Sequence, residues 1–283
     1  EEGCYHFVKK LLRFLPANNL ENPPRLANDD TPNRLCSGLE EIVPADSTKA
    51  YEMKEVINEI FDEDSFFGLQ RFFAKNAIIG LARLDGFPVG VVANQPKVLA
   101  GCLDIDASDK IARFVRFCDA FNLPVINLVD VPGYLPGINQ EHQGIIRHGA
   151  KIIYAYATAT VPKIAVVLRK AYGGAYIALA SKQMGYDQVL AWPTAELAVM
   201  GAEQAVDIVY GKELAKSQNP EDKHKYTEEF RKKFMTPYTA ASMGQIDMII
   251  EPKQTRQILI SSLSSLRHKR VARIGKKHGI MPC

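Results

Sequence analysis

The strongest chemical signal in the sequence is a pair of glycines between an apolar run and a run of small residues. Val166–Leu168 is apolar, Gly173 and Gly174 follow shortly after it, and Ala175–Ser181 is rich in alanine. Glycines let a backbone turn sharply, and the first N–H groups of a helix have no partner within it. The helix dipole adds about half a positive charge at that end. Such a strand-to-helix turn suits the stabilisation of a developing oxyanion by backbone donors. The alternative is a tight connection in which glycine only permits close packing.

A second loop, Asp130–Gly137, follows the apolar run Val125–Val129 and contains two prolines and two glycines. The carboxyl ends of strands are where α/β sheets place ligands. The prolines stiffen this loop, and Tyr134 offers a flat face for a planar ring. No Gly-Lys-Ser/Thr triplet follows, so the loop is not a phosphate-binding Walker loop. The alternative interpretation is a rigid surface turn.

Other chemical motifs are weak. His142 and His148 are not spaced for two metal ligands on one helical face, and the chain has no Gly-x-Ser-x-Gly or Gly-x-Gly-x-x-Gly sequence. We therefore expect no metal site. An α/β core with backbone oxyanion donors, and without an obvious nucleophile or acid–base pair, favours enolate chemistry. In such chemistry the substrate or cofactor moves its own protons.

Composition sets the class of protein. The 283 residues are 47% hydrophobic and 24% charged, with a formal charge of +3, which excludes wholesale disorder and argues against nucleic acid as a partner. The longest apolar runs, such as Val161–Leu168, are far shorter than the roughly 20 residues that span a bilayer. The five cysteines include no Cys-x-x-Cys pair, which favours a reducing compartment.

The elements that position these loops alternate between strand and helix. Short apolar strands separated by amphipathic helices indicate βαβ units and a parallel sheet, with a hairpin at Asp85-Gly86. We predict strands over 78–84, 88–93, 124–130, 164–168, 189–192 and 246–250, and helices over 49–60, 109–121, 141–157, 175–181, 201–214, 227–243 and 255–270. Ser108 is the predicted cap of the second of these helices.

The first residues have a different character. Apolar residues from Phe7 to Leu15 have helical spacing and no initiator Met precedes them, so we interpret the chain as beginning inside a helix of something longer. A processed or engineered start is the alternative. Residues 16–47 are crowded with Pro, Asn and Asp, which predicts a linker with little regular structure.

At these motifs the chain resembles the carboxyltransferase subunit of biotin-dependent acyl-CoA carboxylases, of the propionyl-CoA carboxylase β type. The resemblance covers essentially the whole chain and the second half of the family. The matching runs are 94–97, 101–104, 112–122, 130–137, 144–151, 169–176, 191–196 and 198–202.

The resemblance implies a crotonase-like α/β fold, a spiral of ββα and βαβ units with a parallel sheet core flanked by helices. It further implies that residues 1–15 are the last helix of a missing N-terminal domain, that 16–47 are the interdomain linker, and that 48–283 form the C-terminal domain on the biotin side of the active site. Members of the family form homo-oligomers, from dimers to stacked hexamers, with each active site between the first domain of one subunit and the second domain of another.

The resemblance also assigns roles to residues. The N–H groups of Gly174 and Ala175 would stabilise the ureido oxygen of biotin during carboxyl transfer to an acyl-CoA α-carbon. Residues next to biotin or substrate would be Pro132, Gly133, Tyr134, Tyr172, Gly173 and Ile177. Biotin would arrive on a biotin carboxyl carrier or biotin carboxylase subunit, the substrate would be a coenzyme A thioester, and no metal, nucleic acid or membrane insertion is expected. The compartment would be the cytoplasm, or the mitochondrial matrix in a eukaryote.

Three questions stay open at this stage. Propionyl-type members often have Asp where this chain has Ile177, so the acyl group is propionyl, acetyl or a more distant one. A methylmalonyl-CoA or glutaconyl-CoA decarboxylase α subunit, or a transcarboxylase, would use the same oxyanion donors. The third question is whether the chain is catalytic at all, because a domain with only a binding or assembly role is also possible.

Overall fold

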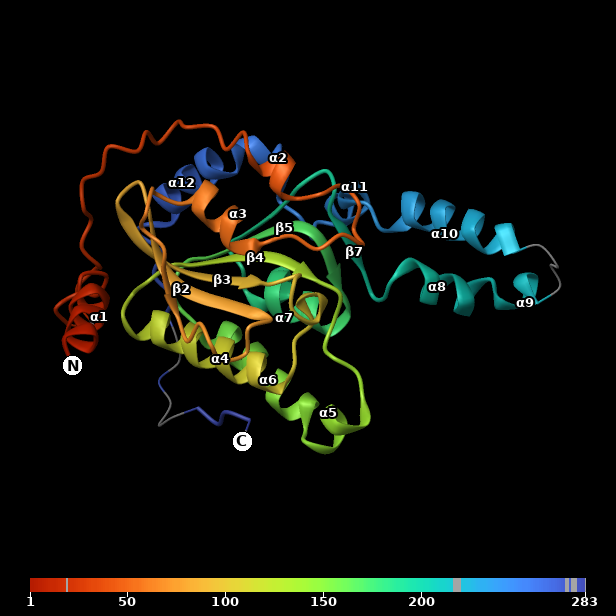
Figure 1. Ribbon diagram of the computed structural model, residues 1–283, viewed down its shortest axis with the longest axis horizontal. Coiled ribbons are helices and arrows are strands. Elements are labelled where there is room, and N and C mark those ends of the chain that lie inside the picture. Colours follow the sequence, from red (N-terminus) through yellow and green to blue (C-terminus); the bar gives the residue numbers. More distant parts are fainter. Residues whose placement is uncertain (19, 216–219, 273–274, 276–278, 283) are drawn as a thin grey trace.

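In the described part of the chain the strands form one eight-stranded sheet at the centre of the fold. The computed structural model describes residues 1–283 apart from 19, 216–219, 273–274, 276–278 and 283 (Figure 1). The strand order is β1-β2-β3-β4-β5-β6-β8, and β7 pairs with β5. The strands are β1 Phe67–Leu69, β2 Ala77–Leu84, β3 Phe87–Asn94, β4 Val125–Val131, β5 Lys163–Tyr172, β6 Gln188–Ala191, β7 Glu196–Ala198 and β8 Met248–Ile249.

The sheet is antiparallel at one side and parallel elsewhere. The predicted hairpin at Asp85-Gly86 is confirmed, because Leu84 of β2 lies opposite Phe87 of β3. From β3 onward every pairing in the order is parallel. The expected α/β class with a mostly parallel sheet is therefore confirmed. Since β4 and β5 run in the same direction, their carboxyl ends meet at one edge of the sheet.

Helices cover both faces of this sheet (Figure 1). On one face α4, α6 and α7 pack against the strands, and on the other α2, α3 and α12 do. The helices are α1 Glu2–Leu12, α2 Leu39–Ile42, α3 Met53–Ile60, α4 Ile105–Ala120, α5 Ile138–His142, α6 Ile145–Thr158, α7 Gly173–Ala180, α8 Ala202–Val209, α9 Gly211–Leu214, α10 Pro220–Phe234, α11 Pro237–Ser242 and α12 Thr255–Leu266, with single 3-10 turns at Leu99–Gly101, Lys182–Met184 and Pro252–Gln254.

The continuous apolar runs of the strands follow from burial on both faces. In β4, Val125 and Val129 join the core beneath α4, α6 and α7, whereas Ile126 and Leu128 join the core beneath α3 and α12. Successive side chains of a strand point to opposite faces, so a strand covered on both sides must be apolar throughout. The polar exceptions are Asp130 and Asn127, and the Asn127 amide donates to the Leu179 carbonyl at 2.8 Å.

The starts of α4 and α3 each differ by four residues from the predictions. Helix α4 begins at Ile105, four residues before the predicted start, because Asp104 rather than Ser108 is its cap and accepts from the Ala107 N–H at 2.8 Å. Ser108 is buried within the helix and donates to the Asp104 carbonyl. Helix α3 begins at Met53 rather than at residue 49, after the cap residue Glu52.

Three predicted helices are each divided in two. The range 141–157 is broken between α5 and α6, where Gly144 has a left-handed φ of 87°. The range 227–243 is broken before Pro237, where Thr236 caps α11 and accepts from Thr239. The range 201–214 is divided at Tyr210, between α8 and α9. Strand β7 was not predicted; it is three residues long and pairs with the end of β5.

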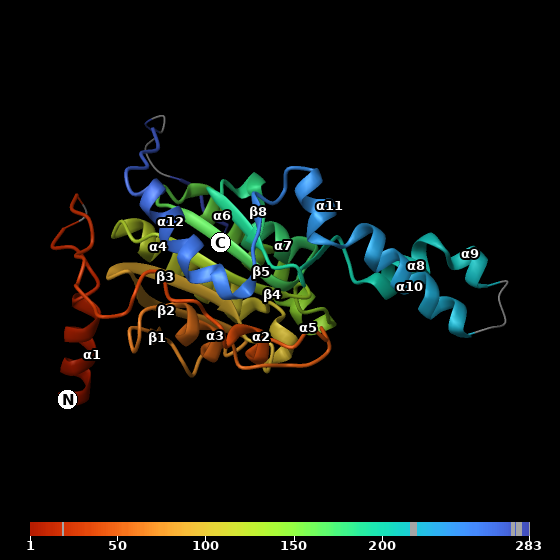
Figure 2. The ribbon, with the colours of Figure 1, turned by 90° about the horizontal axis from the view of Figure 1, so that it is seen from above.

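Residues 16–47 contain more structure than their composition predicts. The short helix α2 lies within them, and Cys36 and Leu39 are fully buried in the core beneath α3 and α12. Helix α1, where a helix was predicted, has no buried residue. Helices α8, α9 and α10 form an arm that projects from the body (Figure 2).

Candidate functional site

The ends of β4 and β5 are joined by a buried ion pair. The Arg169 Nε and Nη2 atoms each lie 2.9 Å from Asp130 Oδ2, and both side chains are at most 1% exposed. The other oxygen, Asp130 Oδ1, accepts from the Lys170 N–H at 3.2 Å. A buried pair of this kind is strongly destabilising to break, because one charge is then left without a partner. It joins the two strands where their register shifts, between Val129 and Val131 of β4.

The same arginine fastens the segment before α3 to the sheet edge. Arg169 Nη1 donates to the carbonyls of Pro44, Asp46 and Lys49 at 3.2, 2.8 and 2.9 Å. Its guanidinium lies over the Tyr51 ring, 4.7 Å from the ring centroid. The carboxyl edge of β5 is therefore tied to a region more than a hundred residues earlier in the chain.

The loop after β4 is held by backbone hydrogen bonds to the residues that precede α4. The Leu103 N–H donates to the Gly133 carbonyl at 3.1 Å, and the Leu135 N–H donates to the Leu103 carbonyl at 2.8 Å. Pro132 lies half-buried beside them. Gly133 has a φ of 148°, and a side chain there would meet nothing within 4 Å. The loop is thus fixed without a regular element of its own.

Tyr134 brings the two predicted loops together. A Cβ built on Gly174 would lie 3.5 Å from the Tyr134 ring, and one built on Gly149 of α6 would lie only 2.8 Å from it. The Tyr134 hydroxyl donates to the Gly149 carbonyl at 3.3 Å. Burial raises the pKa of Tyr134 above its ordinary value. The ring is therefore a neutral packing surface between α6 and the start of α7.

The turn from β5 into α7 needs a glycine at its first position. Gly173 has a φ of 60°, and a Cβ there would lie 3.1 Å from the Val199 carbonyl oxygen. Helix α7 then begins at Gly173, and no side chain caps it. Among the described residues, the N–H groups of Gly174 and Ala175 meet neither a backbone acceptor nor a capping side chain. Two backbone donors, at the positive end of the α7 dipole, are therefore left without partners at this turn. We call the turn, residues Tyr172–Ala175, the glycine corner.

The corner has an open and a buried side. Gly174 is exposed and Ile177, one turn later, is 46% exposed, whereas the Ala175 side chain is completely buried in the core. Gly174 belongs to this open side, next to the apolar side chain of Ile177, whereas Ala175, its N–H included, has no exposed surface. This arrangement can hold an anionic oxygen of a planar group whose other atoms contact Ile177.

Tyr172 is placed apart from the other predicted site residues. Its ring is 8% exposed and packs with Ala202 and Met235, beneath the arm. Its hydroxyl donates to Glu196 in β7, and burial together with that carboxylate raises the pKa of Tyr172 above its ordinary value. The structure therefore brings Gly173, Gly174 and Tyr134 together, and turns the Tyr172 side chain toward α8 and α10.

Sequence reasoning did not find two residues that build the site. Gly149 lies within a helical pattern, and only the packing of Tyr134 against it shows why it has no side chain. Arg169 lay inside a quoted motif, but nothing in the spacing indicated its ion pair with Asp130. The apolar runs that precede the two residues, Val125–Val129 and Ile164–Leu168, were the available signal that both charges are buried.

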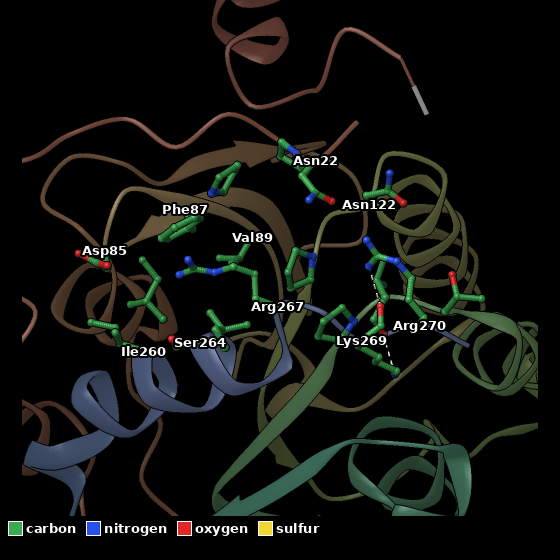
Figure 3. A pocket seen from close by; sticks show the side chains of 18 of the residues that line it. Asn22, Asp85, Phe87, Val89, Asn122, Ile260, Ser264, Arg267, Lys269 and Arg270 are labelled. Carbon is green, nitrogen blue, oxygen red and sulfur yellow. Dashed lines mark hydrogen bonds between the residues drawn. The ribbon is translucent and has the colours of Figure 1, made fainter. Parts of the chain in front are cut away.

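The described residues contain no group of three side chains suited to hold a metal ion. In that same part of the chain, no helix has both the length and the apolar character that a membrane crossing requires. A cavity of about 430 Å³ is lined by residues 87–89, by Pro124 and Pro162 and by α12, so it lies at the amino ends of β3, β4 and β5, away from the glycine corner (Figure 3).

The fold and the turn from β5 into α7 define an α/β protein with unpaired backbone amides at a strand-to-helix turn. A model of the carboxyl transferase domain matches residues 1–281, and the chain belongs to this family.

The chain is similar to several members of the family that have been named. It is 53% identical over 283 residues to the propionyl-CoA carboxylase carboxyltransferase subunit of Haloferax mediterranei, covering 100% of this chain and 55% of the relative. It is 51% identical over 282 residues to the methylmalonyl-CoA decarboxylase subunit alpha of Veillonella parvula, covering 100% of this chain and 54% of the relative. The chain therefore spans about half the length of these relatives.

A solved structure agrees with the fold. The transcarboxylase 12S subunit, determined as a hexamer with methylmalonyl-coenzyme A and methylmalonic acid bound, superposes with a TM-score of 0.94 at 48% identity, over 98% of this chain and 54% of that chain. The predicted crotonase-like class is confirmed.

Proposed function

We propose that this chain forms the biotin side of an acyl-CoA carboxyltransferase active site, with the N–H groups of Gly174 and Ala175 as the oxyanion donors. The observation that carries the proposal is the pair of unpaired N–H groups at the exposed start of α7. Family membership supports it, because the relatives are named for carboxyl transfer to and from acyl-CoA.

The residues at the corner suit the biotin ureido ring. When bound, biotin carries the carboxyl group and gains negative charge on its ureido oxygen as that group leaves. The Gly174 and Ala175 amides donate to that oxygen, and the dipole of α7 favours the charge. The Gly173 turn aims the amides, and the Tyr134 ring supports Gly174 from behind. Pro132 and Gly133 form the stiff loop that would lie beside the ureido ring.

The remaining parts of the site would come from outside this chain. We infer that a first domain, from a second subunit of a homo-oligomer, supplies the coenzyme A pocket and the donors for the thioester oxygen. A biotin carboxyl carrier or biotin carboxylase subunit brings the biotin. The compartment is the cytoplasm, or the mitochondrial matrix in a eukaryote.

Ile177 is proposed to border the acyl group. Its side chain is 46% exposed on the same side of α7 as Gly174. We expect Ile177→Asp in the complete subunit to change the ratio of kcat/KM between acetyl-CoA and propionyl-CoA by about tenfold, because a charged group replaces an apolar one at the pocket wall. Steady-state kinetics with both substrates measures the ratio. An unchanged ratio would remove Ile177 from the acyl pocket.

The direction of transfer is a separate question. Relatives named for carboxylation and for decarboxylation match at 53% and 51%, and a transcarboxylase structure at 48%, so similarity favours no direction. The partner subunits discriminate: purification with a biotin carboxylase indicates synthesis, and purification with a membrane subunit indicates decarboxylation.

The test of the proposal is Gly174→Val in the complete subunit. A branched side chain at this position presses on the Tyr134 ring and shifts the amides, so we expect transfer from methylmalonyl-CoA to free biotin to fall about 10²–10³-fold. Gly174→Ala is the matched control for folding, since its Cβ makes an ordinary 3.5 Å contact. A folded Gly174→Val subunit that transfers at the unsubstituted rate would contradict the assignment.

A binding role alone predicts a different result. A domain that only assembles with partners would bind biotin weakly and would show no transfer in any context. If the complete subunit transfers the carboxyl group and loses this activity when Gly174 is substituted, a binding role alone is ruled out.

A further inference from the structure

The cavity at the amino ends of β3, β4 and β5 has the features of a small-molecule site. Its volume of about 430 Å³ lies within the range of ligand pockets. Its walls come from four separate parts of the chain: residues 20–23, the β2–β3 hairpin, the residues just before β4 and β5, and α12 with the residues after it. Figure 3 shows these side chains around one space.

One wall of the cavity is aliphatic. Leu84 and Val89 from the hairpin face Ile260 and Leu263 of α12 across it. Pro124 and Pro162 complete this lining and donate no backbone hydrogen bond. An alkyl chain that enters this space would bury apolar surface without removing many polar groups of the protein from water.

The residues at and after the end of α12 bring positive charge to the cavity that the described residues do not fully neutralise. Lys269 is paired with Asp187 at 2.8 Å, and Asp85 with Arg25 at 2.9 Å. Among the described residues, neither Arg267 nor Arg270 has a carboxylate within ion-pair distance. Arg270 Nη1 donates only to the Lys269 carbonyl, at 2.9 Å, and the Arg267 guanidinium lies 4.1 Å from the Phe87 ring centroid.

Neither of two simpler explanations accounts for this arrangement. Arg267 follows the last residue of α12 and suits the helix dipole there. That explanation does not extend to Arg270, which lies beyond the helix. Two described residues near the end of the chain lie elsewhere, because Met281 contacts Arg116 of α4 and Gly279 lies beside Tyr154 of α6.

We propose that this cavity binds a small amphipathic anion, with its alkyl part between the hairpin and α12 and its carboxylate or phosphate on Arg267 and Arg270. Guanidinium groups donate two parallel hydrogen bonds to a pair of carboxylate or phosphate oxygens, and the apolar lining favours an alkyl tail. The Phe87 face is already covered by Arg267, so the tail is aliphatic rather than aromatic. This ligand is independent of the proposed carboxyl transfer.

Binding of octyl phosphate and of octanoate, measured by isothermal titration calorimetry on the 283-residue chain and on the complete subunit, tests the proposal. We expect saturable binding that weakens by about tenfold or more in the double variant Arg267→Gln, Arg270→Gln. Octanol, which lacks the charge, should bind about tenfold more weakly than octyl phosphate. Arg113→Gln, an exposed arginine on α4, is the control and should leave affinity unchanged.

Two further arms make the result decisive. Ser264→Trp places a large side chain from the exposed surface of α12 into the cavity, and should abolish binding while the thermal midpoint stays within a few degrees. Sedimentation with phosphatidylglycerol vesicles distinguishes a lipid head group in a membrane from a free ligand. Equal affinity in all variants, equal binding of octanol, no saturable binding, or arginine-dependent vesicle binding in place of binding to octyl phosphate would each overturn the proposal.

Discussion

The two edges of the sheet are built on opposite principles. At the carboxyl edge the charges of Asp130 and Arg169 are paired and at most 1% exposed, and no capping side chain meets the backbone amides at the start of α7 among the described residues. At the amino edge the cations Arg267 and Arg270 are exposed and lie beside an open cavity. The start of α7 therefore depends on rigid backbone geometry, whereas the cavity at the amino edge depends on side chains that tolerate replacement.

The largest effect that tests this contrast is on stability. We expect Arg169→Met to lower the free energy of unfolding by about 3–5 kcal/mol, because the Asp130 carboxylate is left buried without its cation. Arg267→Met at the amino edge should cost less than about 1 kcal/mol, since an exposed cation loses little. Urea unfolding of both variants measures the difference. Similar losses at the two edges would show that the contrast is wrong.

The next effect separates two neighbouring glycines. Gly173→Ala should cost about 1–2 kcal/mol, because residue 173 has a left-handed φ of 60° and the new Cβ lies 3.1 Å from the Val199 carbonyl oxygen. Gly174→Ala should be neutral or slightly stabilising, because alanine favours helix and the space is adequate. Thermal unfolding of the two variants is the measurement. Equal costs would mean that the turn does not depend on Gly173.

The smallest effect concerns pH. Burial raises the pKa of Tyr134 above its ordinary value, so the folded state keeps a proton that the unfolded chain loses near pH 10. The stability from this group is fully present below about pH 10 and is lost as the pH rises further. We expect the unfolding free energy to fall less steeply with pH in Tyr134→Phe than in the unsubstituted chain. Identical slopes above about pH 10 would indicate that the phenol is not buried.

Much of the architecture was predictable because it depends on local patterns. Apolar strands buried on both faces stand out as uninterrupted runs, as Val125–Val131 shows, and a Gly-Gly pair between strand and helix marks a sharp turn. The open start of α7 follows from the same pattern. These features need no knowledge of distant residues.

The features that escaped prediction depend on distant contacts or on choices between similar residues. Asp104 and Ser108 are both good caps, and the burial of Ser108 decides between them. The break at Gly144 interrupts no apolar period, so only its left-handed backbone reveals it. The partner of Tyr134, Gly149, is recognised only after α6 has packed against the loop.

The bonds from Arg169 to the carbonyls of Pro44, Asp46 and Lys49 decide where this polypeptide can be shortened. A truncation that starts at α3 would keep every strand and every glycine of the corner. It would nevertheless remove three carbonyl acceptors from the buried guanidinium of Arg169. Expression vectors that begin upstream of residue 44 preserve that inner anchor.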